Sequence, residues 1–350
     1  MLKIPTFSTS LINWYGQHKR NLPWRNTKDP YKIWISEIVL QQTRVDQGLA
    51  YYERFIKAFP SVSKLAAANE EEVLRMWQGL GYYSRARNLH FTAKVISNEH
   101  GGIFPTTYSE ILSLKGIGEY TAAAISSFAY KLPYAVMDGN VMRVVTRLFG
   151  IEVSIHSGPG KKIIKESLDS LFDEKRPDEF NQAIMEFGAL HCVPVNPNCE
   201  DCPFSTECVA FNTGKVQDLP IRKKSGQKKN RYFNYAVIRS GRKIILKKRQ
   251  SKDIWQNMYE FPMKENQSMK ESFDISDLLS VAQEDSIYIL KEKSHWKTHL
   301  LSHQKIHARF HEFEVDQIET SLKDDWEILD LDDVDNYPLP KLIESYMNGR

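Results

Sequence analysis

The four cysteines constrain the fold of this chain most strongly. All of them lie in one segment, CVPVNPNCEDCPFSTEC, at Cys192, Cys199, Cys202 and Cys208. Disulfides are rare in cytosolic proteins, so cysteines clustered in this way predict a metal site. Structural zinc sites usually divide their ligands into two distant pairs, whereas the gaps here are short throughout. The spacing therefore favours a loop folded around a [4Fe–4S] cluster, with zinc or unligated cysteines as alternatives.

A glycine hairpin precedes the cysteines, in the segment LKGIGEYTAAAI with Gly116 and Gly118. The preceding SEILSL is predicted to be helical, and Thr121 stands where a dinucleotide-binding fingerprint has its third glycine. Glycines allow backbone N–H groups to approach a ligand at the start of the next helix, which favours an anion such as a DNA phosphate. A tight turn between two helices is the alternative interpretation.

Two carboxylates stand out as candidate catalytic groups. Asp138 opens the predicted helix DGNVMRVVTRLFG, where it can serve as the N-cap and where the helix N-terminus favours its ionised form. Such a carboxylate can stabilise the oxocarbenium-like sugar that forms when a glycosidic bond breaks. Glu37, in WISEIVLQQT, has apolar residues one turn away on both sides, which favours a neutral carboxyl able to donate a proton. A plain N-cap and a surface glutamate are the alternatives.

The chain is long enough for two domains, and its composition changes once. Residues 1–220 are predicted to be mainly α, with helix-length apolar runs at 31–43, 119–130, 140–149 and 179–191 and a capping box that starts a helical stretch at Asn69. Residues 221–231 form a basic linker, and residues 232–350 contain short strand-like runs that predict a smaller α+β domain.

Composition also narrows the possible partners and location. Net charge is only +3, so affinity for nucleic acid must come from local basic patches. No run approaches the roughly 20 apolar residues of a membrane span, and the N-terminus is too polar for a secretory signal. We therefore expect a cytoplasmic protein that does not bind membranes.

The cysteine spacing, the hairpin and Asp138, in this order, resemble the helix-hairpin-helix DNA glycosylases, the superfamily of endonuclease III. The segments LPWR, WISEIVLQQT, GLGYYSRARNL and FNQAIMEFGAL closely resemble the adenine DNA glycosylases, the MutY family. The resemblance covers residues 5–220 almost continuously and the remainder weakly. It implies a helix-hairpin-helix catalytic region with a [4Fe–4S] cluster, followed by a Nudix-like domain that recognises 8-oxoguanine.

The resemblance also implies an activity and the residues that perform it. Members of the family flip adenine opposite 8-oxoguanine or guanine out of double-stranded DNA and hydrolyse it. Carried over by motif, Glu37 protonates adenine N7 and Asp138 stabilises the sugar cation, with support from Tyr120 and Asn140. Three residues are expected to line the adenine pocket: Trp24, Arg25 and Gln182. Strand-cleaving relatives carry a lysine where Tyr120 stands, so we expect a monofunctional glycosylase. We also expect the protein to be a monomer.

A further set of residues is expected to contact DNA. Gln42, Thr43, Leu80 and Tyr82 match positions that wedge into the base stack beside 8-oxoguanine, although core packing is the alternative for Leu80 and Tyr82. Gly116 and Gly118 are expected at a phosphate, as are Arg85 and Arg87. In the C-terminal domain, Ser302 and His303 match residues placed against 8-oxoguanine, but Leu301 replaces the aromatic residue of the family. The loop between Cys192 and Cys199 has no basic residue to contact phosphate.

Three rival interpretations remain at this point. An endonuclease III-like enzyme is disfavoured by Tyr120, and a mismatch thymine glycosylase is disfavoured by Glu37, because N7 protonation suits a purine. A lesion-binding protein without catalysis is disfavoured by the presence of both Glu37 and Asp138.

The C-terminal domain lacks the paired glutamates of a Nudix hydrolase, which favours binding without hydrolysis. In KIHARFH, alternation predicts a strand rather than a metal-binding helix. One face of this strand is apolar, with Ile306, Ala308 and Phe310, and the other is basic, with Lys305, His307, Arg309 and His311.

Overall fold

The computed structural model describes residues 4–222, 226–278, 288–318 and 325–349. The chain divides into two compact units: Met1–Ala67 with Phe91–Ser225, and Ala68–His90 with Gly226–Arg350. The segment 68–90 thus belongs to the same unit as the C-terminal region. Part of the expected basic linker, residues 223–225, lies outside the described residues, and strand β1 already begins at Lys229. No helix in the described part of the chain is long and apolar enough to span a membrane.

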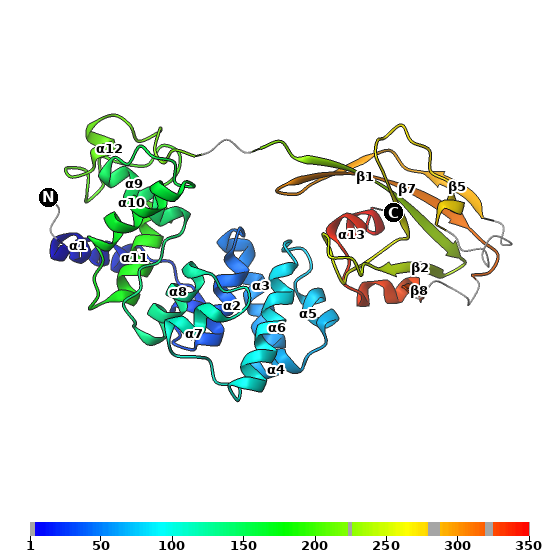
Figure 1. Ribbon diagram of the computed structural model, residues 1–350, viewed down its shortest axis with the longest axis horizontal. Helices are drawn as coiled ribbons and strands as arrows, with labels where there is room; N and C mark the ends of the chain where they lie inside the picture. Colours follow the sequence, from blue (N-terminus) through cyan, green and yellow to red (C-terminus); the bar gives the residue numbers. More distant parts are fainter. Residues whose placement is uncertain (1–3, 223–225, 279–287, 319–324, 350) are drawn as a thin grey trace. The chain divides into compact units, whose positions relative to one another are not determined.

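The first unit is helical, as predicted (Figure 1). Its described elements, with the part of α6 that reaches the second unit, are α1 (Ile4–His18), η1 (Pro23–Arg25), α2 (Pro30–Leu40), α3 (Val45–Ala58), α4 (Val62–Ala67), α6 (Ser84–Glu99), α7 (Tyr108–Ser113), α8 (Glu119–Tyr130), α9 (Gly139–Phe149), α10 (Gly158–Asp169), α11 (Pro177–Leu190) and α12 (Val209–Asn212). The four apolar runs correspond to α2, α8, α9 and α11, which confirms the helical periodicity.

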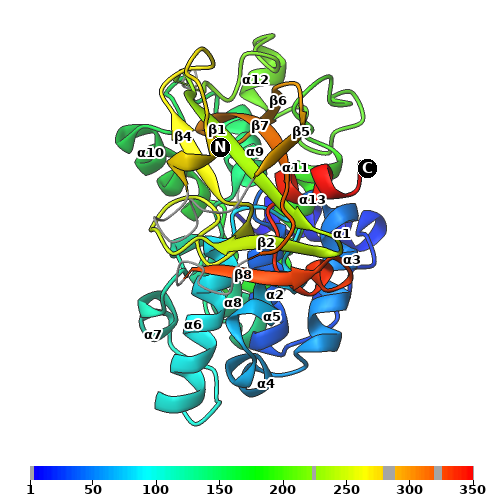
Figure 2. The same cartoon turned by 90° about the vertical axis from the view of Figure 1, so that its right-hand side faces the viewer.

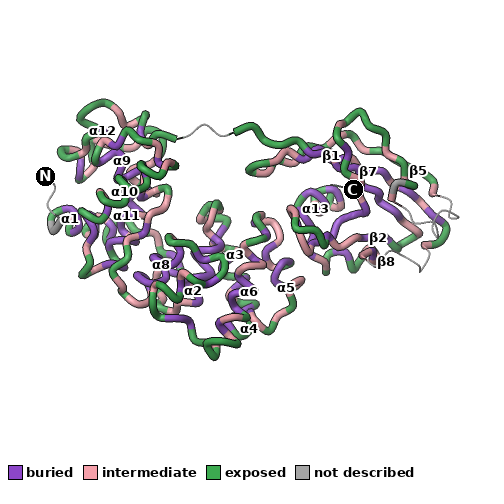
Figure 3. The backbone as a smooth tube through the Cα atoms, in the orientation of Figure 1, coloured by how far each residue is buried: buried purple, intermediate pink, exposed green. Residues whose placement is uncertain are grey.

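The core of this unit forms around α2, α8 and α11. Helix α2 packs against α3 and α8, while α11 packs against α1, α8 and α9. Figure 3 shows α2 and α8 largely in the colour of buried residues. Each buried apolar side chain such as Trp34 or Ile35 contributes about 1.5–3 kcal/mol, so these helices are held firmly. A polar side chain placed on them has a well-defined position.

The helical stretch that starts at Asn69 is interrupted. The capping box is present, because Glu72 accepts a hydrogen bond from the Asn69 backbone N–H at 3.0 Å. Helix α5 (Glu70–Met76) ends soon afterwards, and α6 begins only at Ser84. Between them Gly79 (φ 92°), Gly81 (φ 71°) and Tyr82 (φ 46°) lie in the left-handed region, which is incompatible with a continuous helix. The resulting loop presents Tyr82 with 41% of its surface exposed.

The second unit contains a mixed sheet, in agreement with the predicted α+β domain. Strand β1 (Lys229–Ser240) runs parallel to β7 (Gln304–Glu314) and forms the centre of the sheet. Figure 2 shows β2 and β8 side by side, and the register pairs Ile245 with Ile328. The remaining described elements are β2 (Lys243–Lys248), β3 (Tyr259–Glu260), β4 (Met263–Asn266), η2 (Ile275–Asp277), β5 (Ile289–Lys293), β6 (Lys297–Leu300), β8 (Trp326–Asp330), η4 (Leu331–Asn336) and α13 (Lys341–Met347).

Strand β7 confirms the alternation seen in KIHARFH. Ile306, Ala308 and Phe310 are fully buried on one face. The opposite face is less exposed than the pattern suggested, because His307 and His311 are also buried. Their Nε2 atoms lie 3.1 Å and 3.0 Å from the Oδ1 atoms of two asparagines on β1, Asn230 and Asn234. These histidines therefore hold the two central strands together.

Candidate active site

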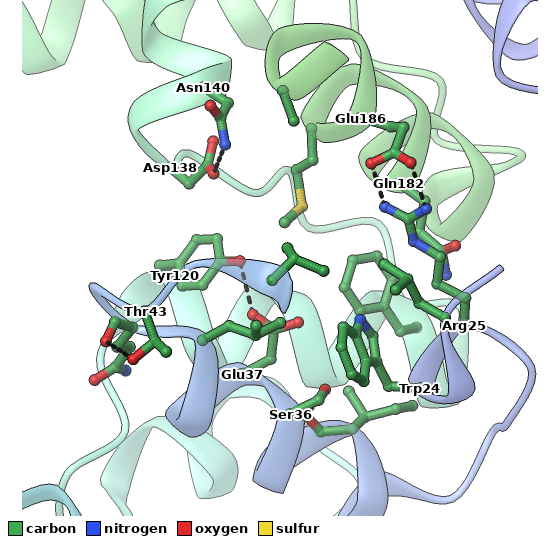
Figure 4. A pocket seen from close by; sticks show the side chains of 18 of the residues that line it. Trp24, Arg25, Ser36, Glu37, Thr43, Tyr120, Asp138, Asn140, Gln182 and Glu186 are labelled. Atoms are coloured by element: carbon green, nitrogen blue, oxygen red, sulfur yellow. Dashed lines mark hydrogen bonds and ion pairs between the residues drawn. The ribbon is translucent and has the colours of Figure 1, made fainter. Parts of the chain in front are cut away.

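A cavity of about 560 Å³ opens in the first unit and is lined by residues of η1, α2, α8, α9 and α11. This volume lies in the range of small-molecule pockets. Figure 4 shows Asp138 and Asn140 on one side of the cavity and Glu37 on the other, with Tyr120 between them. Nine residues expected to function in catalysis or base binding line it: Trp24, Arg25, Glu37, Gln42, Thr43, Tyr120, Asp138, Asn140 and Gln182.

Glu37 is a buried acid with one specific partner. It lies on α2 among buried apolar side chains and is 6% exposed. The Tyr120 hydroxyl donates to Glu37 Oε2 at 2.7 Å. Burial raises the pKa of Glu37 to about 7, although the hydrogen bond from Tyr120 opposes this effect. Because Tyr120 occupies Oε2, the other oxygen is available to carry a proton that faces the cavity.

Asp138 caps α9, as its sequence position predicted. Its Oδ1 atom accepts from the Val141 backbone N–H at 2.7 Å, and its Oδ2 atom accepts from Asn140 Nδ2 at 2.9 Å. Both bonds favour the carboxylate form. Burial acts in the opposite direction and raises the pKa of Asp138 above its ordinary value. The hydrogen bonds at the helix N-terminus therefore offset only part of the rise in pKa that burial causes. The sequence pattern did not reveal this burial.

An ion cluster forms the wall beside Trp24. Glu186 on α11 accepts from Arg25 Nη1 at 2.7 Å and Nη2 at 2.6 Å, and Arg20 binds the same carboxylate through Nε at 2.9 Å. Burial would raise the pKa of Glu186, but hydrogen bonds from the two arginines outweigh it and lower the pKa to about 2. Arg25 is thus held by Glu186 as part of the cavity wall. Bidentate pairs of this kind fix a guanidinium in one orientation.

Sequence reasoning missed several residues of this cavity. Arg20, Ser36, Met185 and Glu186 line it but were not singled out. The only available signal for Glu186 was an acidic residue inside an otherwise apolar helical run, FNQAIMEFGAL. Its arginine partners lie more than 160 positions away in sequence, so the pairing could not be read from local pattern.

The residues expected beside 8-oxoguanine form a second group, within the second unit. Leu80, Tyr82, Ser302 and His303 line a cavity of about 560 Å³ whose other lining residues include Trp255. The hydroxyls of Tyr82 and Ser302 are hydrogen-bonded to each other. Gln42 and Thr43, by contrast, line the cavity around Glu37. The expected lesion contacts therefore divide between the two units.

The arginines expected at phosphate have partners within the protein. Arg85 donates to the carbonyl oxygens of Leu80 and Gly81, both at 3.2 Å, and its guanidinium lies 5.2 Å from the Trp77 ring. Arg87 Nη1 donates to Gln256 O at 3.0 Å. Arg85 thus stabilises the loop that carries Tyr82, whereas Arg87 is bonded to the backbone at Gln256.

The glycine hairpin has the predicted form. It connects α7 to α8, with Gly116 in the left-handed region at φ 84° and Gly118 as the N-cap of α8. A Cβ atom added at Gly118 would meet nothing within 4 Å, so the backbone there is accessible. The hydroxyl of Thr92 donates to Lys115 O at 2.7 Å and fastens the turn to α6. Such an exposed helix N-terminus can accept an anion.

The four cysteines lie around one small cavity of about 30 Å³. Arg147 on α9 reaches this loop, donating through Nη1 to Cys192 Sγ at 3.4 Å and to Val193 O at 2.7 Å. A second arginine of α9, Arg143, links Asn140 Oδ1 at 2.9 Å with the backbone oxygen of Cys192 at 2.8 Å. Within the described ranges, no three His, Cys, Asp or Glu side chains are arranged to hold a single metal ion.

Comparison with known proteins identifies both parts of the chain. Residues 35–174 match the HhH-GPD superfamily of base excision DNA repair proteins, and residues 234–349 match the NUDIX domain. An adenine DNA glycosylase from Buchnera aphidicola subsp. Baizongia pistaciae is 36% identical over 302 residues, covering 84% of this chain and 83% of the relative. The adenine DNA glycosylase of Homo sapiens is 39% identical over 230 residues, covering 62% of this chain and 41% of the relative.

Solved structures give the same fold. A thermostable thymine-DNA glycosylase superposes with a TM-score of 0.55 at 28% identity, covering 60% of this chain and 97% of that one. Endonuclease III in a non-covalent DNA complex gives a TM-score of 0.52 at 20% identity, covering 61% of this chain and 99% of that one. Both cover about the helical part of the chain, which therefore has the architecture of the superfamily.

Proposed function

This chain belongs to the adenine DNA glycosylases, hydrolases of N-glycosyl bonds, and we propose that it removes adenine paired with 8-oxoguanine or guanine from double-stranded DNA without cleaving the strand. One observation carries the proposal: a buried acid bonded to Tyr120 and a capped carboxylate face the same cavity. An acid and a carboxylate on either side of a scissile bond are the groups that glycoside hydrolysis requires.

Glu37 supplies the proton for the first step. With its pKa raised to about 7, an appreciable fraction of Glu37 is protonated at neutral pH. The proton passes from its free oxygen to N7 of adenine, and the electron pair of the C1′–N9 bond moves into the base as that bond breaks. Tyr120 remains protonated, because burial raises its pKa well above the ordinary value, so it can donate to Glu37 throughout.

Asp138 stabilises the sugar that remains. As the bond breaks, positive charge develops on the ring oxygen and C1′, and an ionised carboxylate lowers the energy of this state. Asn140 and the Val141 N–H hold the carboxylate in place. Water then adds to C1′ and gives its proton to the Glu37 carboxylate, which restores the acid for the next cycle.

The absence of a suitable lysine supports a monofunctional enzyme. No lysine is among the described residues that line the cavity, where Tyr120 takes the position of the lyase residue. Lys115, on the hairpin, lies with Nζ 4.4 Å from the centre of the Phe91 ring. A Schiff base with the sugar would need an amine at C1′.

Recognition of 8-oxoguanine is assigned to the second unit. Tyr82 is exposed on its loop and hydrogen-bonded to Ser302, so a wedge residue and a polar lesion contact form one group. An exposed aromatic ring can enter a base step and offset part of the unstacking cost.

We further propose that the enzyme acts as a monomer in the cytoplasm.

The cysteine loop is proposed to hold a [4Fe–4S] cluster through Cys192, Cys199, Cys202 and Cys208. Four cysteines with short spacings throughout lie around one cavity, which fits the ligand set of a [4Fe–4S] cluster better than the two distant pairs usual for zinc. When bound, the cluster would cross-link the loop. Purified protein should contain about four iron and four sulfide per chain. Cys199→Ser should lower both, and stoichiometric zinc without sulfide would refute the assignment.

Single-turnover cleavage of four matched duplexes tests the activity. They carry adenine opposite 8-oxoguanine, adenine opposite guanine, cytosine opposite 8-oxoguanine, and thymine opposite guanine. We expect cleavage of the two adenine duplexes only, and only after alkali. Cleavage of the thymine duplex would favour a mismatch thymine glycosylase, and cleavage without alkali would favour a lyase.

Glu37→Gln tests the acid in the same assay. The amide preserves size and the bond from Tyr120 but carries no transferable proton, so excision should fall by about 10²–10⁴-fold while duplex affinity is kept. Glu166→Gln, an exposed substitution on α10, is the matched control and should behave as wild type. Near-normal excision by Glu37→Gln would remove Glu37 from the mechanism.

A further inference from the structure

A tyrosine that no sequence pattern singled out is hydrogen-bonded to Gln182, a residue of the expected adenine pocket. Tyr15 lies on α1, is 7% exposed, and donates its hydroxyl to Gln182 Oε1 on α11 at 2.6 Å. Gln182 lines both the cavity around Glu37 and a second cavity of about 350 Å³ on its far side, which Tyr15 also lines. Tyr15 itself is not among the described residues lining the cavity around Glu37, and its hydrogen bond to Gln182 connects it to that cavity.

Helix packing and two neighbouring cations hold the Tyr15 side chain in place. Helices α1 and α11 pack directly on each other. The guanidinium of Arg25, itself bound by Glu186, lies 5.7 Å from the centre of the Tyr15 ring, and Lys19 Nζ lies 5.6 Å from it. Burial raises the pKa of Tyr15 above its ordinary value, so the phenol keeps its proton and remains a donor.

This contact selects one of the two orientations of the Gln182 amide. With Oε1 turned to the phenol, Nε2 is the polar atom left for a ligand, and it has no hydrogen-bond acceptor among the described residues. The opposite orientation would leave the phenol hydrogen without an acceptor, which is unfavourable in a buried site.

We propose that Tyr15 is a positioning residue, which orients the Gln182 amide so that its N–H group is offered to the base. The ring nitrogens of adenine accept hydrogen bonds, so an N–H group offered at this point can donate to one of them. The inference rests on the proposed function. Small errors in the position of a base-binding group reduce catalysis strongly, so the orienting bond affects excision without touching the base.

A double-mutant cycle on excision tests the coupling. Tyr15→Phe keeps the ring and removes the hydroxyl, and should lower the single-turnover rate about tenfold at unchanged duplex affinity. In a Gln182→Ala background the same change should alter the rate less than twofold, because no amide remains to be oriented. Tyr130→Phe, which removes a hydroxyl that donates to Phe104 O at 3.3 Å in the same unit, is the control and should match wild type. Equal losses in both backgrounds, or no loss at all, would overturn the proposal.

A second variant covers the case in which Tyr15→Phe does not fold. Gln182→Glu keeps an oxygen acceptor for the Tyr15 hydroxyl but offers no N–H group, so excision should fall at least tenfold. Wild-type excision by this variant would overturn the proposal, because the donor would then be dispensable.

Side-chain NMR separates this inference from the proposed function. In protein labelled with ¹⁵N-glutamine, the Gln182 NH₂ signals are identified by their loss in Gln182→Ala. Tyr15→Phe should shift or broaden them, and unchanged signals would overturn the positioning role. If wild-type protein fails to excise adenine, the proposed function is wrong, while the NMR measurement still decides whether Tyr15 orients the amide.

Discussion

At the scale of single residues, the surroundings of Glu37 account for its chemistry. Its apolar neighbours were visible in the sequence, because Ile33, Trp34 and Leu40 lie one turn away on the same helix. The structure adds the direct bond from Tyr120 and the location of Asp138 across the cavity. Local periodicity can indicate that a carboxyl is buried, but its partners come from other helices, and only the resemblance to a family suggested them.

The raised pKa of Glu37 predicts the pH dependence of excision. The acid must be protonated to act, so the active fraction is high below pH 7 and falls about tenfold per pH unit above it. Single-turnover rates between pH 5 and 9 on the adenine–8-oxoguanine duplex should therefore show a basic limb with a midpoint near 7. A rate that stays constant up to pH 9 would mean that a different group supplies the proton.

At the scale of secondary structure, the site depends on how closely α9 and α11 approach. Their existence was predictable from apolar periodicity, but their contact was not. Gly188 on α11 lies against Asn140 on α9: an added Cβ would be 2.7 Å from Asn140 Cβ and 2.9 Å from Asn140 O. Since Asn140 holds Asp138, a glycine on one helix sets the position of a carboxylate on another.

Gly188→Ala should therefore reduce both stability and activity. The new methyl must displace Asn140 or separate the helices, and overpacking of this kind costs about 1–3 kcal/mol. Urea unfolding should show this loss, and excision should decrease because Asp138 loses its support. Gly158→Ala on α10 is the control, since a Cβ there meets nothing within 4 Å. Stability equal to wild type in Gly188→Ala would show that the two helices can separate at no cost.

At the scale of the whole molecule, two segments that are far apart in the sequence, residues 68–90 and 226–350, form one compact unit. The change in composition near residues 221–231 predicted a C-terminal domain after it, but nothing in the sequence assigned residues 68–90 to the same unit as residues 226–350. That assignment rests on specific pairs, such as Glu71 with Lys248 at 2.5 Å and with the Tyr259 hydroxyl at 3.0 Å. Pairs separated by more than 170 positions leave no local signal. The sequence therefore predicted Tyr82 and Ser302 as separate lesion contacts, whereas the structure joins them.

The bond between Tyr82 and Ser302 makes the lesion preference testable by one small change. Ser302→Ala removes the hydroxyl that bonds to Tyr82 and that would contact 8-oxoguanine. The preference for adenine opposite 8-oxoguanine over adenine opposite guanine should fall by about 5–10-fold, the value of one hydrogen bond. Excision opposite guanine should stay near wild type, because Glu37 and Asp138 are unchanged. Ser240→Ala, which removes a hydroxyl bonded to Asp316 O at the end of β1, should leave the preference intact. If Ser302→Ala lowers both rates equally, the bond positions the loop that carries Tyr82 for DNA binding in general, and the 8-oxoguanine contact must be assigned to another residue.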